Sequence, residues 1–176
     1  MAQALIRGWR MSNIPDNPCV ACTTNQHCCT RLSGLILTQK EFDVLFKSHA
    51  EGLLVRQSNK VVIVSTKDGG ACPNWAKGGC GIYQDRPIDC RIFPYILTRV
   101  IEKRNKVKII FHTKTDCPQK DRMYALMPES AARALAMEFG KKIYGEDKTI
   151  IVECEKGLLS QLRIRIETAI SRRCFK

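Results

Sequence analysis

The sequence has no apolar run that approaches the roughly 18 residues a membrane-spanning helix needs. Its N-terminal 18 residues also lack an apolar stretch long enough for a signal peptide. We therefore expect a protein of the cytoplasm with no membrane partner. Because that compartment keeps thiols reduced, metal binding or thiol chemistry explains the ten cysteines better than structural disulfides do.

Acidic residues are fewer than basic ones, and a glycine-rich motif for binding a nucleotide-like cofactor is missing. The 17 Asp and Glu are outnumbered by 29 Lys and Arg, which gives a formal charge of +12. The basic residues are scattered and lack an aromatic-rich binding signature, so we favour solubility and compensation of an anionic metal site over a nucleic-acid partner. Gly69-Gly70 and Gly78-Gly79 are too short, and too close to cysteines, to form a glycine-rich S-adenosylmethionine motif.

Internal repeats, low-complexity tracts and clear linkers are missing too, so residues 1–176 are most simply a single domain. A capping box at Thr38 and Glu41 predicts the start of a helix. The pattern further predicts a β-hairpin turning at 103–105 and a helix that stops at Gly145. The full set is helices over about 39–48, 128–144 and 155–172, and strands at 61–64, 95–102, 106–112 and 149–152. The predicted fold class is α+β: a small irregular cysteine-rich metal-binding core at 19–118, with a β-hairpin, and a helical C-terminal extension at 119–176.

The stretch from Cys72 to Pro94 is the main evidence in the sequence for a metal site. It holds three cysteines, three prolines and three glycines, so it cannot form one helix or one strand. We expect a metal to hold it in shape, together with the upstream group that begins at Cys19.

The ten cysteines fall into two kinds. Cys154 and Cys174 lie in or beside helical patterns, where a cysteine is usually a small buried hydrophobe, and we do not assign them as ligands. The other eight lie in turn-rich segments and have no comparable packing role. The predicted metal ligands are Cys19, Cys22, Cys28, Cys29, Cys72, Cys80, Cys90 and Cys117.

The spacing of these cysteines limits how they can share metals. Cys19-x-x-Cys22 lets one turn point two sulfurs at one ion. The side chains of Cys28-Cys29 diverge, so the pair fits better if each serves a different centre or one bridges two ions. Two linked four-ligand sites and one cluster with spare thiols both stay open.

Thiolate ligands favour zinc, Cu(I) or an iron–sulfur cluster. Zinc ribbons usually show two CxxC knuckles, and this chain shows one. Cys72-Pro73 and Cys117-Pro118 follow a ferredoxin-like pattern, so we favour an iron–sulfur cluster slightly over zinc.

Several neighbours of the cysteines have alternative roles. Arg86 and Arg91 flank the thiolates and could stabilise them, and a plain surface role is equally open. Asp85 and Asp89 are interpreted as turn and capping residues. His27 is interpreted as a surface loop histidine, although it could ligate the metal. His49 and His112 are interpreted as ordinary.

The cysteine pattern resembles the YkgJ-type cysteine-cluster proteins, also called the CxxCxxCC or zinc/iron-chelating domain family. The resemblance covers about residues 19–118. It rests on Cys19-x2-Cys22-x5-Cys28-Cys29, on Cys72-Pro73, and on the run G-C-x-I-Y-x-x-R-P-x-x-C-R-x-F-P at 79–94, matched at every fixed position. The spacer between Cys22 and Cys28 is longer than the family name implies, and Trp75 stands where an aliphatic residue is common.

The resemblance implies that these cysteines bind zinc or iron. We therefore expect a cytoplasmic metal-binding protein whose clustered cysteines coordinate an iron–sulfur cluster or zinc. Some family members are similar to flagellin lysine N-methylases, so the resemblance also implies an alternative: an enzyme that methylates a protein substrate at the metal centre. The net charge motivates another alternative, a nucleic-acid-binding module with structural zinc. A thiol-redox role would rest on Cys28-Cys29 alone.

Overall fold

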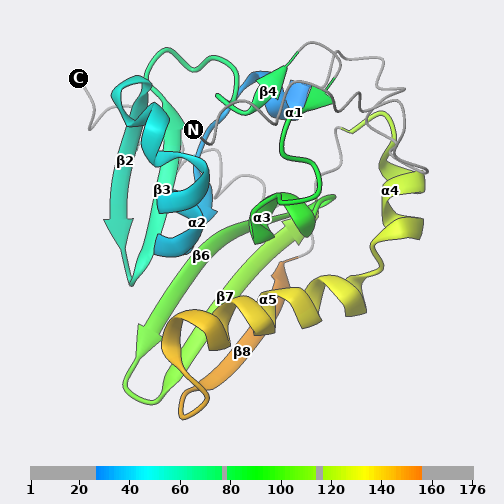
Figure 1. Ribbon diagram of the computed structural model, residues 1–176. Coiled ribbons are helices and arrows are strands. Elements are labelled where there is room, and N and C mark those ends of the chain that lie inside the picture. Colours follow the sequence, from blue (N-terminus) through cyan, green and yellow to red (C-terminus); the bar gives the residue numbers. More distant parts are fainter. Residues whose placement is uncertain (1–26, 77–78, 114–116, 156–176) are drawn as a thin grey trace.

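The structure is a computed structural model of the chain, and it describes residues 27–76, 79–113 and 117–155. Within these residues the fold is a mixed α+β arrangement of three small sheets with helices around them (Figure 1). The strands are β1 (Leu35–Leu37), β2 (Leu53–Ser58), β3 (Val61–Thr66), β4 (Trp75–Ala76), β5 (Gly79–Cys80), β6 (Tyr95–Lys103), β7 (Lys106–Thr113) and β8 (Thr149–Glu155). The helices are α1 (His27–Thr30), α2 (Gln39–Leu45), α3 (Ile88–Arg91), α4 (Lys120–Leu126) and α5 (Glu129–Tyr144), with a 3₁₀ helix, η2, at Lys47–Gly52. The predicted α+β class is confirmed.

The three sheets differ in size and topology. The first has the antiparallel order β1-β3-β2, and the second is the short antiparallel pair β4-β5. The third has the order β6-β7-β8, in which β6 and β7 form the expected hairpin and β8 joins β7 in parallel. In Figure 1, α5 runs along the third sheet, and α3 lies between that sheet and the upper part of the molecule that holds α1 and β4.

Alternate side chains of β7 point into the main hydrophobic core. Val107, Ile109 and Phe111 are fully buried, as the period-two pattern predicts. The buried face of α5 packs in the same cluster. Gly140 sits inside α5 because a Cβ there would lie 2.8 Å from side-chain carbons of both Ile109 and Ile150. The helix and the sheet therefore approach more closely than an alanine would allow.

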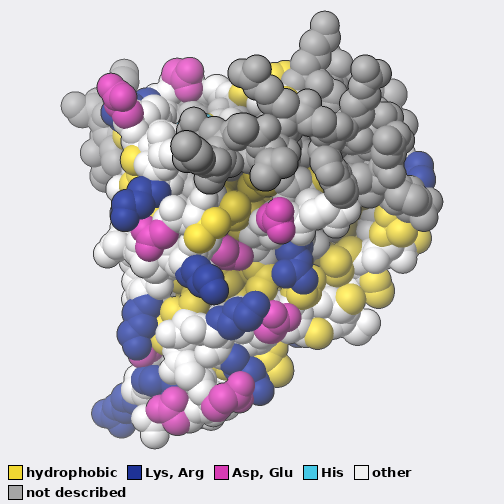
Figure 2. Space-filling view, viewed as in Figure 1, with side chains coloured by type: hydrophobic (Ala, Val, Ile, Leu, Met, Phe, Trp, Pro, Cys, Tyr) yellow, Lys and Arg dark blue, Asp and Glu magenta, His cyan; other side chains and the backbone are white. Residues whose placement is uncertain are grey.

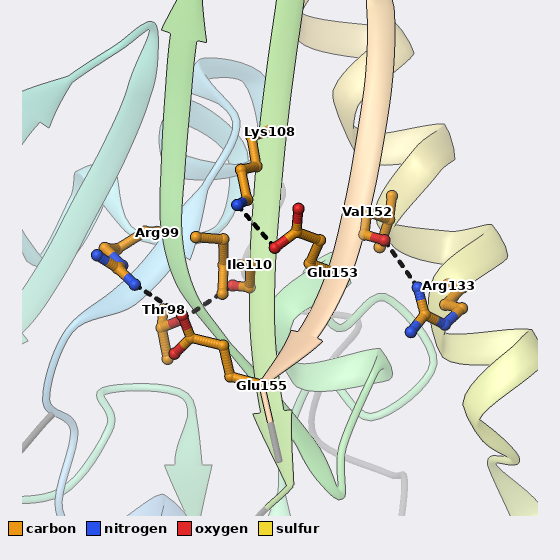
Figure 3. A network of polar contacts seen from close by, with 8 residues as sticks. All are labelled: Thr98, Arg99, Lys108, Ile110, Arg133, Val152, Glu153 and Glu155. Atoms are coloured by element: carbon orange, nitrogen blue, oxygen red, sulfur yellow. Dashed lines mark hydrogen bonds and ion pairs between the residues drawn. The ribbon is translucent and has the colours of Figure 1, made fainter. Parts of the chain in front are cut away.

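Polar contacts fix β8 beside its neighbours (Figure 3). Arg99 of β6 pairs with Glu155 at 2.8 Å, and Lys108 of β7 pairs with Glu153 at 2.7 Å. Arg133 of α5 donates from Nη1 to a main-chain carbonyl of β8 at 2.7 Å. Partly exposed ion pairs contribute little free energy each, so their main effect here is to fix the register of the strand.

Charge on the molecular surface is mixed. On the face shown in Figure 2, Lys and Arg side chains lie among Asp and Glu and do not form a patch of one sign. This distribution fits the interpretation of the net charge as solubility rather than a nucleic-acid surface. Among the described residues, no helix has both the length and the apolar character to span a membrane.

Most of the predicted elements are present, and the short elements between them are additional. The first helix, the hairpin and the helix ending at Gly145 are confirmed, and the strand predicted at 149–152 continues to Glu155. The elements that the sequence analysis does not predict are α1, β1, β2, η2, β4, β5, α3 and α4. Of the helix expected at 155–172, Glu155 belongs to β8, and the remaining residues lie outside the described ones.

The capping box at the start of α2 is confirmed, and it has a second role. Thr38 Oγ1 accepts the Glu41 amide at 3.1 Å, and Glu41 Oε2 accepts the Thr38 amide at 2.8 Å. The other carboxylate oxygen of Glu41 accepts the amide of Ile88 at 2.8 Å. Because Ile88 opens α3, one side chain caps two helices.

We expect Glu41→Ala to lower the free energy of unfolding by about 2–3 kcal/mol, and Thr38→Ala by about 1 kcal/mol. The glutamate loses bonds to both helices, whereas the threonine loses one cap. Urea unfolding of both variants measures the difference, with the exposed Glu51→Ala as the control. Equal losses for Glu41→Ala and Thr38→Ala would show that the bond to α3 contributes nothing.

Candidate metal centre

A small hairpin carries two of the predicted ligands. Cys72 lies just before β4, and Cys80 lies in β5 opposite Trp75 in the ladder. The Cys72 amide donates to the carbonyl of Cys29 at 2.8 Å, which joins the upstream cysteine segment to this hairpin. The Asn74 side chain donates to the carbonyl of Leu45 at 3.0 Å and ties the same loop to the end of α2.

The third ligand candidate, Cys90, lies on α3, which two carboxylates hold in place. Asp89 is buried and accepts the amide of Ile36 in β1 at 2.9 Å and the amide of Leu97 in β6 at 3.0 Å. Glu41 accepts the first amide of α3, as described above. The helix that carries Cys90 is therefore fixed to both large sheets at once.

Electrostatics shows that Cys72, Cys80 and Cys90 lie within range of one another. Burial raises the pKa of all three thiols, and that of Cys90 lies well above its ordinary value. The charge of Cys80 further raises the pKa of Cys72, and both raise that of Cys90. Backbone N–H groups oppose this effect: that of Asn74 at Cys72 and that of Ile82 at Cys80. A bound cation would favour the ionised forms of these thiols.

Arg86 is the cation that acts on this group. Its charge lowers the pKa of both Cys80 and Cys90, against the larger effect of burial. Its Nε donates to the carbonyl of Tyr83 at 2.9 Å, and its guanidinium carbon lies 3.7 Å from the centroid of the Tyr83 ring. The side chain is half-buried.

The other charged residues that flank the cysteines, Arg91 and Asp85, are exposed and have other partners. Arg91 is exposed, and its charge contributes to lowering the pKa of Glu138 on α5, where a hydrogen bond from Lys142 has the larger effect. Asp85 is exposed in a turn, which its amide closes by donating to the carbonyl of Ile82 at 2.9 Å.

Cys117 lies in a different environment from Cys72, Cys80 and Cys90. It precedes α4, and its charge and that of Cys154 both contribute to a raised pKa of Tyr124, for which burial is the main cause. Cys154 is partly buried against the main core cluster, which fits its interpretation as a small hydrophobe. The contacts of the described residues therefore group Cys117 with Tyr124 and Cys154.

The remaining predicted ligands lie outside the description. Cys19 and Cys22 precede the described residues, as Cys174 follows them, and the side chains of His27 and Cys28 in α1 are not described. His49 is exposed in η2 and His112 is half-buried in β7. Within residues 27–76, 79–113 and 117–155, no set of three or more His, Cys, Asp or Glu side chains stands ready to hold a metal ion. A complete site therefore needs donors beyond this part of the chain.

Sequence reasoning missed the residues that support the site. Asp89 was assigned to turns and caps, yet it bridges β1 and β6. Glu41 was recognised only as a cap of α2. The sequence analysis assigns no role to Asn74, whose side chain ties the cysteine loop to the end of α2. An available signal was the acidic residue placed directly before Cys90, since a carboxylate inside an apolar run needs buried donors.

The donor set fits zinc or iron in its chemistry. Cys72, Cys80 and Cys90 form no disulfide and offer sulfur donors. Thiolate sulfur is the ligand that zinc and iron–sulfur clusters share. Cys72, Cys80 and Cys90 are candidate donors, and a complete site would also need donors outside the described residues.

Comparison with known proteins agrees with this chemistry. A family model described as "CxxCxxCC: Putative zinc- or iron-chelating domain" matches residues 18–123, more than half of the chain. No curated protein and no solved structure gives a significant match.

Proposed function

Because the chain belongs to the CxxCxxCC family of zinc- or iron-chelating domains, we propose that it is a metal-binding protein whose eight loop cysteines hold an iron–sulfur cluster or zinc. The observation that carries this proposal is the proximity of Cys72, Cys80 and Cys90: Cys72 and Cys90 pack against one apolar cluster, and the charges of Cys72 and Cys80 raise the pKa of Cys90. These thiols lie just before β4, in β5 and on α3, and a bound cation would favour their ionised forms.

Between the two metals, we favour the iron–sulfur cluster slightly. Cys72 and Cys117 are each followed by proline, and the chain has a single CxxC knuckle. Backbone N–H groups that point at cysteine sulfur, as at Cys72 and Cys80, are a common means of tuning cluster potentials.

A reducing compartment suits this function. A thiolate site assembles only where thiols stay reduced. We therefore propose that the protein works in the cytoplasm.

Metal analysis of protein purified without oxygen tests the proposal. We expect brown protein with broad visible absorption, iron and acid-labile sulfide. Colourless protein with about two zinc ions per chain would support closed structural sites instead. Protein that contains neither metal, and takes up neither on reconstitution, would contradict the proposed function.

A further inference from the structure

The helix α5 has one buried face and one exposed face. Ala132, Ala136 and Phe139 are fully buried and pack in the main core cluster. The helix lies at the outside of the molecule beside the third sheet (Figure 1). The residues of the exposed face recur at intervals of three and four positions, as neighbours on one side of a helix do. They are Ser130, Ala134, Met137, Glu138, Lys141 and Lys142.

The exposed face has an apolar part. Met137 is 41% exposed, and Ala134, one turn earlier, is exposed as well. A helix face that only meets water is normally polar along its length. A shallow groove of about 410 Å³ lies here, lined by Ala134, Met137, Glu138, Lys141, Lys142 and Glu146. An exposed methionine in a groove is typical of a protein-binding surface.

The charges that line this groove balance one another. Lys142 pairs with Glu138 at 2.6 Å, and Lys141 pairs with Glu146 at 2.8 Å. Even with Arg91 of α3, whose charge also acts on Glu138, the local excess is a single positive charge. The whole chain carries +12, so two copies repel each other least where their surfaces are locally near neutral. Both ion pairs are exposed, so the same charges can also pair across an interface at little cost.

Two copies of this face are complementary when the two α5 helices run antiparallel. A two-fold axis at the level of residues 139–140 places Glu138 of each copy opposite Lys141 of the other. The same axis places Met137 opposite Lys142 of the other copy, where the thioether can pack on the aliphatic stem of the lysine. Each contact occurs twice, because a two-fold interface uses one patch on both copies.

We propose that the exposed face of α5 is the interface of a homodimer in which two copies of the chain pack this helix antiparallel. The proposal goes beyond metal binding and does not depend on it. The helix has 16 residues and is therefore about 24 Å long. A contact of this length is small for a protein interface, so we expect a weak dimer with a dissociation constant of about 10–100 μM.

Sedimentation equilibrium of the full-length protein, at constant metal content, measures the association. We expect monomer at about 1 μM and mostly dimer at about 500 μM. Met137→Asp should raise the dissociation constant at least about tenfold, because it buries a carboxylate in the interface. Val44→Asp is the matched control, since Val44 lies on α2 and is 72% exposed. Its dissociation constant should stay within about twofold of wild type.

Charge-swapped pairs test the antiparallel arrangement. The double variant Glu138→Lys with Glu146→Lys makes the groove entirely basic, and Lys141→Glu with Lys142→Glu makes it entirely acidic. Each double variant alone should remain monomeric at about 500 μM, because like charges meet across the two-fold axis. An equimolar mixture of the two should form a heterodimer at least as tight as the wild-type dimer. Circular dichroism checks that each variant is folded.

A wild-type chain that stays monomeric over the whole concentration range would overturn the proposal. A dimer that survives Met137→Asp, and whose charge variants associate as well alone as when mixed, would assign the interface to another surface. If a double variant does not fold, the comparison of Met137→Asp with Val44→Asp decides, because equal dissociation constants in these two contradict a role for α5.

Discussion

A Cys90→Ser protein should lose most of its bound metal and unfold at least about 10 °C below wild type. Cys90 is the candidate ligand on α3, and it packs with Cys72 against the cluster that fills the first sheet. A serine there removes a thiolate and places a hydroxyl against apolar side chains. Structural metals contribute about 10–16 kcal/mol in small domains, so losing even a fraction of that is a large change.

Metal content and thermal unfolding of the same preparation measure this effect. Cys154→Ser is the control, because it makes the same atomic change at a partly buried cysteine that packs on the other core cluster. We expect wild-type metal content and a loss of about 1 kcal/mol in that variant. Chelation of the wild-type metal should lower its melting temperature to about that of Cys90→Ser. Full metal content in Cys90→Ser would remove it from the ligand set.

The elements that could be predicted from sequence are those whose signals are local. Thr38 and Glu41 form a capping box within four residues, and the box is present as expected. The alternation of Val107, Ile109 and Phe111 reports a sheet with one buried face, and all three are fully buried. Gly145 ends α5 with a positive φ of 88°, which a glycine accepts without strain.

The elements that could not be predicted depend on partners far along the chain. The burial pattern of β2 has one buried position, Leu53, so the strand shows no alternation that the sequence could report. The four-residue helix α3 is too short to have a periodic signal, and it persists because Glu41 and Asp89 tie it to other elements.

The same limit applies to the candidate site. A turn-rich context predicts by type that the cysteines are ligands, but their grouping depends on tertiary structure. The fold gathers Cys72, Cys80 and Cys90 and leaves Cys117 near Tyr124. Arg86 and Arg91 are equivalent in the sequence, and the fold distinguishes them because Arg86 is held by Tyr83 whereas Arg91 is exposed.

Asp89 gives the second large expected effect. Its two oxygens accept the amides of Ile36 and Leu97, at the places where β1 and β6 meet α3. Burial raises the pKa of Asp89 to about 7, while these two amides act in the opposite direction. The raised pKa reflects the cost of removing the ionised carboxylate from water. Its net contribution to the free energy of unfolding is therefore smaller than the two hydrogen bonds alone would suggest.

We expect Asp89→Ala to lower the free energy of unfolding of the metal-loaded protein by about 2–4 kcal/mol, because it leaves two buried N–H groups without acceptors. Asp89→Asn should lose about half as much, since its amide oxygen can accept one bond while its NH₂ faces the other donor. Denaturant unfolding at constant pH measures both, with the exposed Asp85→Ala as the control. If Asp89→Ala instead unfolds within about 0.5 kcal/mol of wild type, the two sheets do not depend on this carboxylate. In that case Cys90 must be positioned chiefly by the metal and not by the fold that surrounds it.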